Sequence, residues 1–150
     1  LIDMLTFYTI GFTKKSAEKF FELLKANKVS KLIDVRISNS SQLAGFAKGK
    51  DLEYFTKAIC GATYKHIVDF APTKELLAKW HKEEINWEQY TQIYTDLLKG
   101  RCIERKYNIS NFDNSCFLCS EDTPEMCHRR LLVEYLNHHT DEEVKIIHLM

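Results

Sequence analysis

Short apolar runs alternate along the chain with longer stretches in which apolar residues recur every three or four positions. The short runs are rich in β-branched and aromatic residues, a composition typical of strands. They occupy residues 5–10, 29–36, 64–70, 116–119 and 144–149. In the second run Leu32, Ile33 and Val35 are almost continuous, as expected for a strand that is buried on both faces of a sheet. We therefore predict about five strands.

The longer stretches predict amphipathic helices, because spacings of three and four place side chains on one helix face. The clearest stripe consists of Trp87, Tyr90, Ile93, Tyr94, Leu97 and Leu98. Residues that can cap a helix N-terminus precede the stretches. The predicted caps are Thr13 or Ser16, Asp51, Asn86 and Thr123, the last followed by Pro124 at the first helical position. A further helix is predicted to start at Pro72-Thr73. Gly61 and Gly100 end two of the helices, and residues 101–114 predict only a ragged helix.

Strands and helices alternate along the whole chain. This alternation is typical of βαβ units, in which helices cover both faces of a parallel sheet. The chain shows no internal repeat, low-complexity tract or interdomain linker. We therefore expect an α/β fold, namely a single three-layer α/β/α domain over residues 1–150 with a mostly parallel sheet of about five strands.

Composition narrows the classes of function. The chain has 21 basic and 21 acidic residues and a formal net charge of zero, which argues against a general nucleic-acid binder because such proteins usually carry a basic face. No apolar run approaches the length of about 20 residues that crosses a bilayer, and residues 1–12 lack the pattern of a signal peptide. An odd number of cysteines, five, favours a reducing compartment over a disulfide framework. We expect a cytoplasmic protein without a membrane partner.

Asp34 and Arg36 lie two positions apart at the end of the second predicted strand, so their side chains share one face. The Arg36 guanidinium offers two parallel donors to a phosphate or carboxylate, and Asp34 is a candidate base or a residue that orients Arg36. The alternative is a structural ion pair. Charged groups at the end of so apolar a strand are costly to bury, which makes the pair a candidate for function.

Cys119 and Glu121 repeat this spacing at the end of the fourth predicted strand. Cys127, His128 and Arg129 follow in the first turns of the predicted helix, whose N-terminus favours anions, including a thiolate or a phosphate. Cys119 or Cys127 is therefore a candidate nucleophile, and Glu121 or His128 a candidate acid or base. Arg129 is a candidate anion binder. The alternative is that the cysteines pack in the core and the arginine is solvated.

The same residues raise the option of a metal site, because thiolates, imidazoles and carboxylates are all metal ligands. Their spacing differs from the closely paired Cys and His ligands of zinc fingers and ribbons. The chain also has no P-loop, no Gly-x-Gly-x-x-Gly and no nucleophile-elbow sequence. We therefore predict neither a metal nor a cofactor.

A set of short motifs runs through the chain. They are Thr9-Ile10-Gly11, Asp34-Val35-Arg36 with a serine-containing loop and Phe46, Tyr64 with His66, Cys119-x-Glu121, Cys127-His128-Arg129 and Ile147-His148-Leu149. Together they resemble the domain of unknown function family 488, over about residues 5–149. The resemblance implies a small cytoplasmic α/β protein, found mainly in prokaryotes, with no assigned activity. It adds Gly11 and Ser41 to the candidate substrate-binding residues.

Two loop residues depart from that family's usual pattern: Asn39 stands where a proline is usual, and Gln42 stands where an arginine usually follows the loop serine. A fainter likeness is to rhodanese-type domains, which also place Asp-Val-Arg at one strand end and a cysteine at another. Their cysteine lies in a compact loop that cradles an anion. Residues 120–126 contain no glycine and include Pro124, so we rank the rhodanese interpretation second.

Three motifs thus meet at the carboxyl ends of strands, where open α/β sheets bind ligands. We expect a pocket for an anionic small molecule, phosphorylated or nucleotide-like, in which Arg36 and Arg129 hold the anion. Whether the pocket is enzymatic stays open, as does the oligomeric state. One alternative is a non-catalytic binding or regulatory module whose charged residues form a structural network of Asp34, Arg36, Glu121 and Arg129. Another is a nucleic-acid-associated protein.

Overall fold

The computed structural model describes residues 4–40 and 45–150, and its centre is one sheet of five strands. The strands are β1 (Met4–Gly11), β2 (Lys31–Asp34), β3 (Thr63–His66), β4 (Ser115–Cys119) and β5 (Glu143–His148). They lie in the order β3-β2-β4-β1-β5, and every neighbouring pair is parallel. The predicted α/β fold with about five mostly parallel strands is confirmed.

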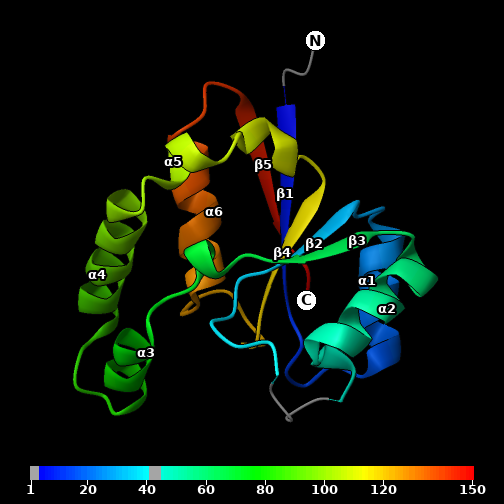
Figure 1. Ribbon diagram of the computed structural model, residues 1–150, viewed down its shortest axis with the longest axis horizontal. Helices are drawn as coiled ribbons and strands as arrows, with labels where there is room; N and C mark the ends of the chain where they lie inside the picture. Colours follow the sequence, from blue (N-terminus) through cyan, green and yellow to red (C-terminus); the bar gives the residue numbers. More distant parts are fainter. Residues whose placement is uncertain (1–3, 41–44) are drawn as a thin grey trace.

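Helices cover both faces of the sheet, which gives three layers (Figure 1). One face carries α1 (Ala17–Ala26) and α2 (Gly49–Cys60). The other carries α3 (Lys74–His81), α4 (Trp87–Gly100), α5 (Ile103–Lys106) and α6 (His128–His138). Short 3-10 turns lie at Gly45–Ala47, Val68–Phe70 and Ile109–Phe112. Helix α6 packs directly on β4, β1 and β5, and α4 packs on α6.

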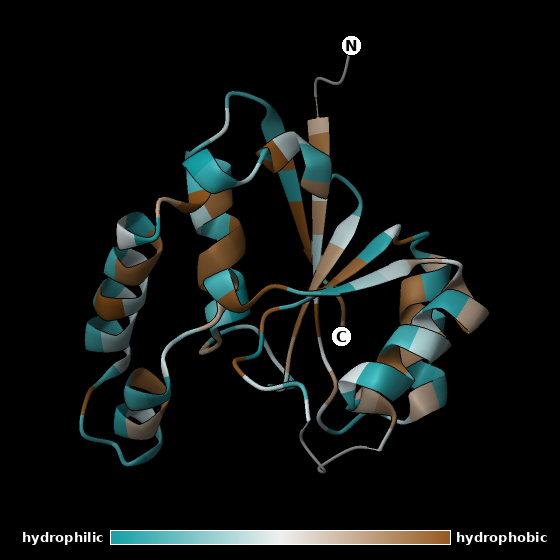
Figure 2. Ribbon diagram, viewed as in Figure 1, coloured by the Kyte–Doolittle hydropathy of each residue, from teal (hydrophilic) through white to brown (hydrophobic). Residues whose placement is uncertain are grey.

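Two apolar clusters lie between the layers, because alternate residues of a strand point to opposite faces. Phe7 and Phe117 belong to the cluster shared with α4 and α6. Ile10 and Leu118 belong to the cluster shared with α1 and α2. Helix α6 shows a broad hydrophobic stretch in Figure 2, and seven of its residues are buried. The sheet is therefore covered on both faces, as the continuous apolar run of β2 predicts.

Capping residues set several helix ends as predicted. Ser16 caps α1, Thr73 caps α3, and Asn86 caps α4 within a capping box. Gly61 ends α2 with φ 67°, a left-handed conformation that glycine adopts without steric cost. Residues 101–114 form the short helix α5 and a 3-10 turn in place of one ragged helix.

Two predicted boundaries are wrong. Helix α2 begins at Gly49, and Asp51 lies in its first turn, because the backbone N–H of Leu52 already donates to the Lys48 carbonyl at 2.7 Å. The strand predicted over 64–70 ends at His66. Beyond that residue the chain turns through a 3-10 segment, which buries Phe70 in the core.

The predicted start of the last helix at Thr123 and Pro124 is also wrong. Helix α6 begins at His128, with Cys127 at its N-cap position. The segment where the helix was expected forms a turn, in which the Cys127 N–H donates to the Pro124 carbonyl at 3.3 Å. Just before it, the backbone carbonyls of Glu121 and Asp122 accept hydrogen bonds from the buried Arg129 side chain.

Candidate functional site

A pocket opens at the carboxyl ends of β2 and β4, beside the start of α6, with a volume of about 760 Å³ that includes its mouth. Because β2, β4 and β1 are parallel neighbours, the segments that follow them meet at this edge of the sheet. Helices α3 and α4 add a wall that contains Leu77, Trp80 and Tyr90. Open α/β sheets bind ligands at this edge, and it is where the sequence motifs predict a site.

Asp34 is fully buried at the end of β2, and both of its carboxylate oxygens are engaged. Oδ1 accepts from the Arg36 backbone N–H at 3.1 Å and from Arg36 Nε at 2.9 Å. Oδ2 accepts from Arg36 Nη2 at 2.7 Å and from the Tyr64 hydroxyl at 2.6 Å. Burial, together with the Asp34 charge, raises the pKa of Tyr64 well above its usual value, so the phenol stays a donor. Asp34 thus positions Arg36, and its oxygens are not free to take a proton from a ligand.

Arg36 lies between this carboxylate and the pocket, which it lines. Its Cζ atom lies 5.1 Å from the centroid of the Phe12 ring, and Nη2 also donates to the Ala47 carbonyl at 2.7 Å. The remaining nitrogen, Nη1, is buried and has no hydrogen-bond partner in the part of the chain that the structure describes. The Arg36 guanidinium is therefore held in place with one donor group unused.

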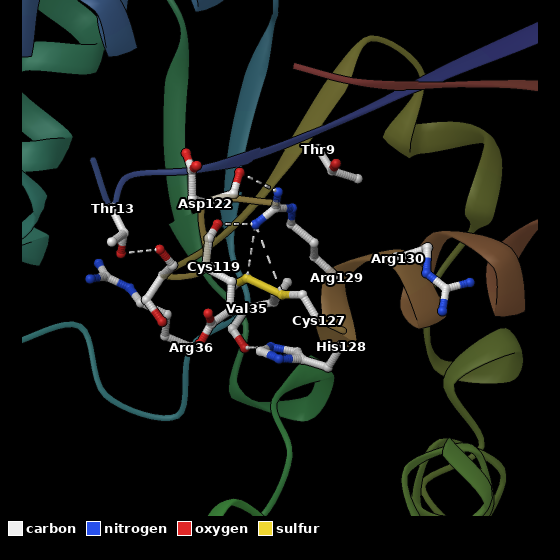
Figure 3. The surroundings of a disulfide bond; sticks show 12 residues. Thr9, Thr13, Val35, Arg36, Cys119, Asp122, Cys127, His128, Arg129 and Arg130 are labelled. Carbon is white, nitrogen blue, oxygen red and sulfur yellow. Dashed lines mark hydrogen bonds between the residues drawn. A yellow bond between two sulfur atoms is a disulfide. The ribbon is translucent and has the colours of Figure 1, made fainter. Parts of the chain in front are cut away.

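Arg129 is fully buried and does not line the pocket. Its Nη1 donates to the Glu121 carbonyl, and its Nη2 donates to the Asp122 carbonyl at 3.3 Å. Nη1 also lies 3.4 Å from Cys119 Sγ and 3.9 Å from Cys127 Sγ. Burial lowers the pKa of Arg129 to about 10. The guanidinium predicted to bind a ligand instead holds the loop between β4 and α6 in place (Figure 3).

Gly11 also has a structural role, because it makes room for the loop between β4 and α6. A Cβ atom at this position would lie 2.6 Å from the Glu121 carbonyl carbon and 2.7 Å from Arg129 Nη1, closer than side chains tolerate. The absence of a side chain lets the loop after β4 pass against the end of β1. Gly11 does not line the pocket. Ser41, the other residue that the family resemblance added, lies outside the described residues.

Cys119 ends β4, Cys127 precedes α6, and the two form a disulfide in the pocket wall (Figure 3). The cysteine count predicted free thiols. Cys119 and Cys127 depart from that prediction because the loop held by Arg129 folds back and brings their two sulfur atoms together. The other three cysteines, Cys60, Cys102 and Cys116, are free.

His128 is the first residue of α6, and its Nε2 lies 2.9 Å from the Val35 carbonyl oxygen. Since a carbonyl only accepts, Nε2 carries the proton and Nδ1 keeps its lone pair. Burial lowers the pKa of His128 to about 4, so the imidazole is neutral. The ring packs edge-on against Tyr94, with centroids 5.7 Å apart. His128 is therefore fixed in one orientation at the pocket wall.

The structure divides the predicted residues into two groups. Arg36, Cys119, Glu121, Cys127 and His128 line the pocket. Asp34, Arg129 and Gly11 lie behind it and shape it. Glu121 is the one exposed residue of the first group. The sequence analysis did not predict that Trp80 and Tyr90 form an aromatic wall of the pocket. The only indication in the sequence was that both residues belong to amphipathic helices that follow β3.

These features define an open, all-parallel α/β protein whose pocket lies at the carboxyl edge of the sheet. Residues 16–136 match the family described as Domain of unknown function DUF488, and the chain belongs to this family, as its motifs predict. No curated protein matches the chain, and no solved structure matches it. Over the described residues, none of the helices combines the length and apolarity that a membrane crossing requires.

Gly11→Ala is expected to destabilise the protein by about 3 kcal/mol, because the new methyl group displaces backbone rather than a mobile side chain. Gly100→Ala is the matched control: a Cβ there meets nothing within 4 Å. Alanine in the last turn of α4 should be neutral or stabilising by up to about 1 kcal/mol. Urea unfolding followed by circular dichroism measures both. Equal free energies of unfolding for the two variants would contradict the assigned role of Gly11.

Asp34→Asn is expected to lower the free energy of unfolding by about 3–5 kcal/mol, because it leaves the Arg36 charge buried without a counter-charge. Tyr64→Phe removes the hydrogen bond to that carboxylate, together with one that the hydroxyl accepts from Asn39, and should cost about 1.5–3 kcal/mol. Glu134→Gln, which breaks the exposed Arg130–Glu134 pair, should cost at most about 0.5 kcal/mol. If urea unfolding gave Glu134→Gln and Asp34→Asn the same loss in free energy of unfolding, the buried network would not be structural.

Proposed function

We propose that the pocket binds an anionic small molecule with a planar aromatic part, such as a nucleotide, and that Arg36 supplies the contact to its anionic group. The single observation that supports this is that Arg36, which lines the pocket, keeps one buried donor, Nη1, without a hydrogen-bond partner among the described residues. Buried donors in folded proteins are nearly always satisfied. An anionic ligand would supply the missing acceptor, and charge-assisted bonds from arginine are among the strongest that proteins make.

The walls of the pocket favour a ligand with an aromatic ring. Phe12, Trp80 and Tyr90 line it together with Leu77. Ligand pockets are typically apolar with a few placed polar groups, and stacking of a base on an aromatic side chain contributes about 1–3 kcal/mol. An apolar wall with one arginine suits a nucleotide better than a bare inorganic anion.

The groups that a bound molecule would meet define the chemistry that we propose. Glu121 is exposed at the pocket and is our candidate for an acid or base. Asp34 is not, since both of its oxygens are occupied by Arg36 and Tyr64. Cys119 and Cys127 also line the pocket, so a ligand would lie beside sulfur as well as carboxylate.

The test is a thermal-shift and calorimetric comparison of nucleoside monophosphates, the matching nucleosides and inorganic phosphate. We expect a monophosphate to raise Tm and to bind more tightly than either fragment, since a ligand that binds only the folded state stabilises it. Arg36→Lys keeps a positive charge beside Asp34 but lacks the second guanidinium edge, and it should weaken binding at least about tenfold, or 1.4 kcal/mol.

Arg130→Lys is the matched control. Arg130 is the next arginine on the same helix as Arg129, it points away from the site in Figure 3, and it bonds to Glu134 and to the Glu125 carbonyl. Its replacement should leave the affinity unchanged. The proposal is wrong if no monophosphate raises Tm, or if folded Arg36→Lys protein binds as tightly as the wild type.

A further inference from the structure

We propose that Cys119, Cys127 and His128 bind a transition-metal ion, with Zn²⁺ as the best fit, and that the fourth coordination position faces the pocket. Each residue offers one ligand atom, and these atoms all lie within 4.8 Å of one another. Two thiolates and an imidazole are a preferred donor set for zinc. The proposal rests on this donor set and not on the anionic ligand proposed above.

The orientation of His128 supports the assignment. Metal-bound histidines almost always donate their second ring N–H to a carbonyl or carboxylate, which fixes the ring and its tautomer. Nε2 of His128 makes this bond to the Val35 carbonyl at 2.9 Å. Nδ1 is therefore the nitrogen with a free lone pair, on a ring already held by Tyr94. The second shell of a metal ligand is present.

The backbone spacing of the two cysteines suits a metal ion. Their Cα atoms are 7.8 Å apart, whereas ordinary disulfides hold them about 4.4–6.8 Å apart. Two thiolates on one tetrahedral zinc, with Zn–S distances of about 2.3 Å, place their sulfur atoms about 3.8 Å apart. The wider span accommodates such an arrangement. We therefore assign the disulfide to the oxidised form of the site and the metal to its reduced form.

The buried charge of Arg129 also favours thiolates. Its guanidinium is fully buried and takes part in no ion pair within residues 4–40 and 45–150. Nη1 lies 3.4 Å and 3.9 Å from the two sulfur atoms. A thiolate accepts such hydrogen bonds more strongly than a neutral disulfide sulfur does, because charge-assisted hydrogen bonds are the stronger ones. Arg129 would thus serve as a positioning residue for the two sulfur ligands.

Three protein ligands leave one position open, which is the arrangement of catalytic zinc sites. All three residues line the pocket, as does Glu121. The open position would take water or an anionic group of a ligand. Formation of the site is balanced by protons: the two thiols release two protons as their sulfur atoms bind Zn²⁺, and neutral His128 binds without losing one.

The experiment uses the full chain under anaerobic conditions. Tris(carboxyethyl)phosphine first reduces the disulfide: the phosphine gives two electrons and takes oxygen from water, and the two sulfur atoms become thiols. The protein is then loaded with Zn²⁺ or Co²⁺ and desalted. We expect elemental mass spectrometry to find one metal ion per chain. The Co²⁺ protein should show the visible absorption bands of a tetrahedral ion and the charge-transfer band of a thiolate ligand.

Cys119→Ser, Cys127→Ser and His128→Gln should each weaken the metal affinity by more than about 100-fold, since loss of a mere second-shell partner already costs 10–100-fold. Glutamine at position 128 keeps an N–H that can reach the Val35 carbonyl and removes only the Nδ1 ligand. Cys60→Ser and Cys102→Ser, at free cysteines outside the cluster, should retain one equivalent.

Three results would each overturn the proposal. One is wild-type protein that is reduced and folded yet takes up no stoichiometric metal, which would leave the pair as a redox-active disulfide only. The second is a cobalt spectrum without thiolate charge transfer. The third is a loss of metal in the Cys60→Ser and Cys102→Ser controls equal to that in the ligand variants. The wild-type measurements decide the matter even where a ligand variant fails to fold, and they do not depend on nucleotide binding.

Discussion

The buried guanidinium of Arg129 is the interaction on which the site depends. Burying a charged guanidinium costs several kcal/mol unless its hydrogen-bond donors are satisfied. The carbonyls of Glu121 and Asp122 satisfy two of its nitrogens, and they reach it only because Gly11 leaves room at the end of β1. The loop between β4 and α6 is folded back as a result. That fold brings Cys127 to Cys119 and sets the start of α6 at His128.

The parts of this structure that follow from local chemistry could be predicted from the sequence. Apolar runs gave the strands, Ser16, Thr73 and Asn86 gave helix starts, and Gly61 gave a helix end. The alternation of elements predicted a parallel sheet, and a parallel sheet places its loops at one edge. The location of the site was therefore predictable before any side chain could be placed.

The roles of individual site residues were not predictable, because they depend on contacts between distant segments. Sequence spacing cannot show that Arg129 points into the protein while Arg36 reaches the pocket. It cannot show that a turn follows the Thr-Pro pair and that α6 begins only at His128. The spacing rule for zinc ligands argued against a metal at Cys119 and Cys127, since that rule describes ligands within one local turn. Here the loop between β4 and α6 folds back and brings the two cysteines together.

The two buried arginines meet the cost of burial in different ways, and the difference shapes the chemistry of the pocket. Arg36 is paired with Asp34, so that its charge is neutralised and a single donor remains. Arg129 donates to two carbonyls, which leave its positive charge unpaired and its Nε without a partner among the described residues. With two thiolates and a divalent ion beside it, the sulfur charges cancel that of the metal and Arg129 leaves the centre with one net positive charge. A metal-loaded site would therefore attract an anionic ligand to the open coordination position, in the pocket that Arg36 also lines. The proposed ligand and the proposed metal are thus linked by the unpaired charge of Arg129.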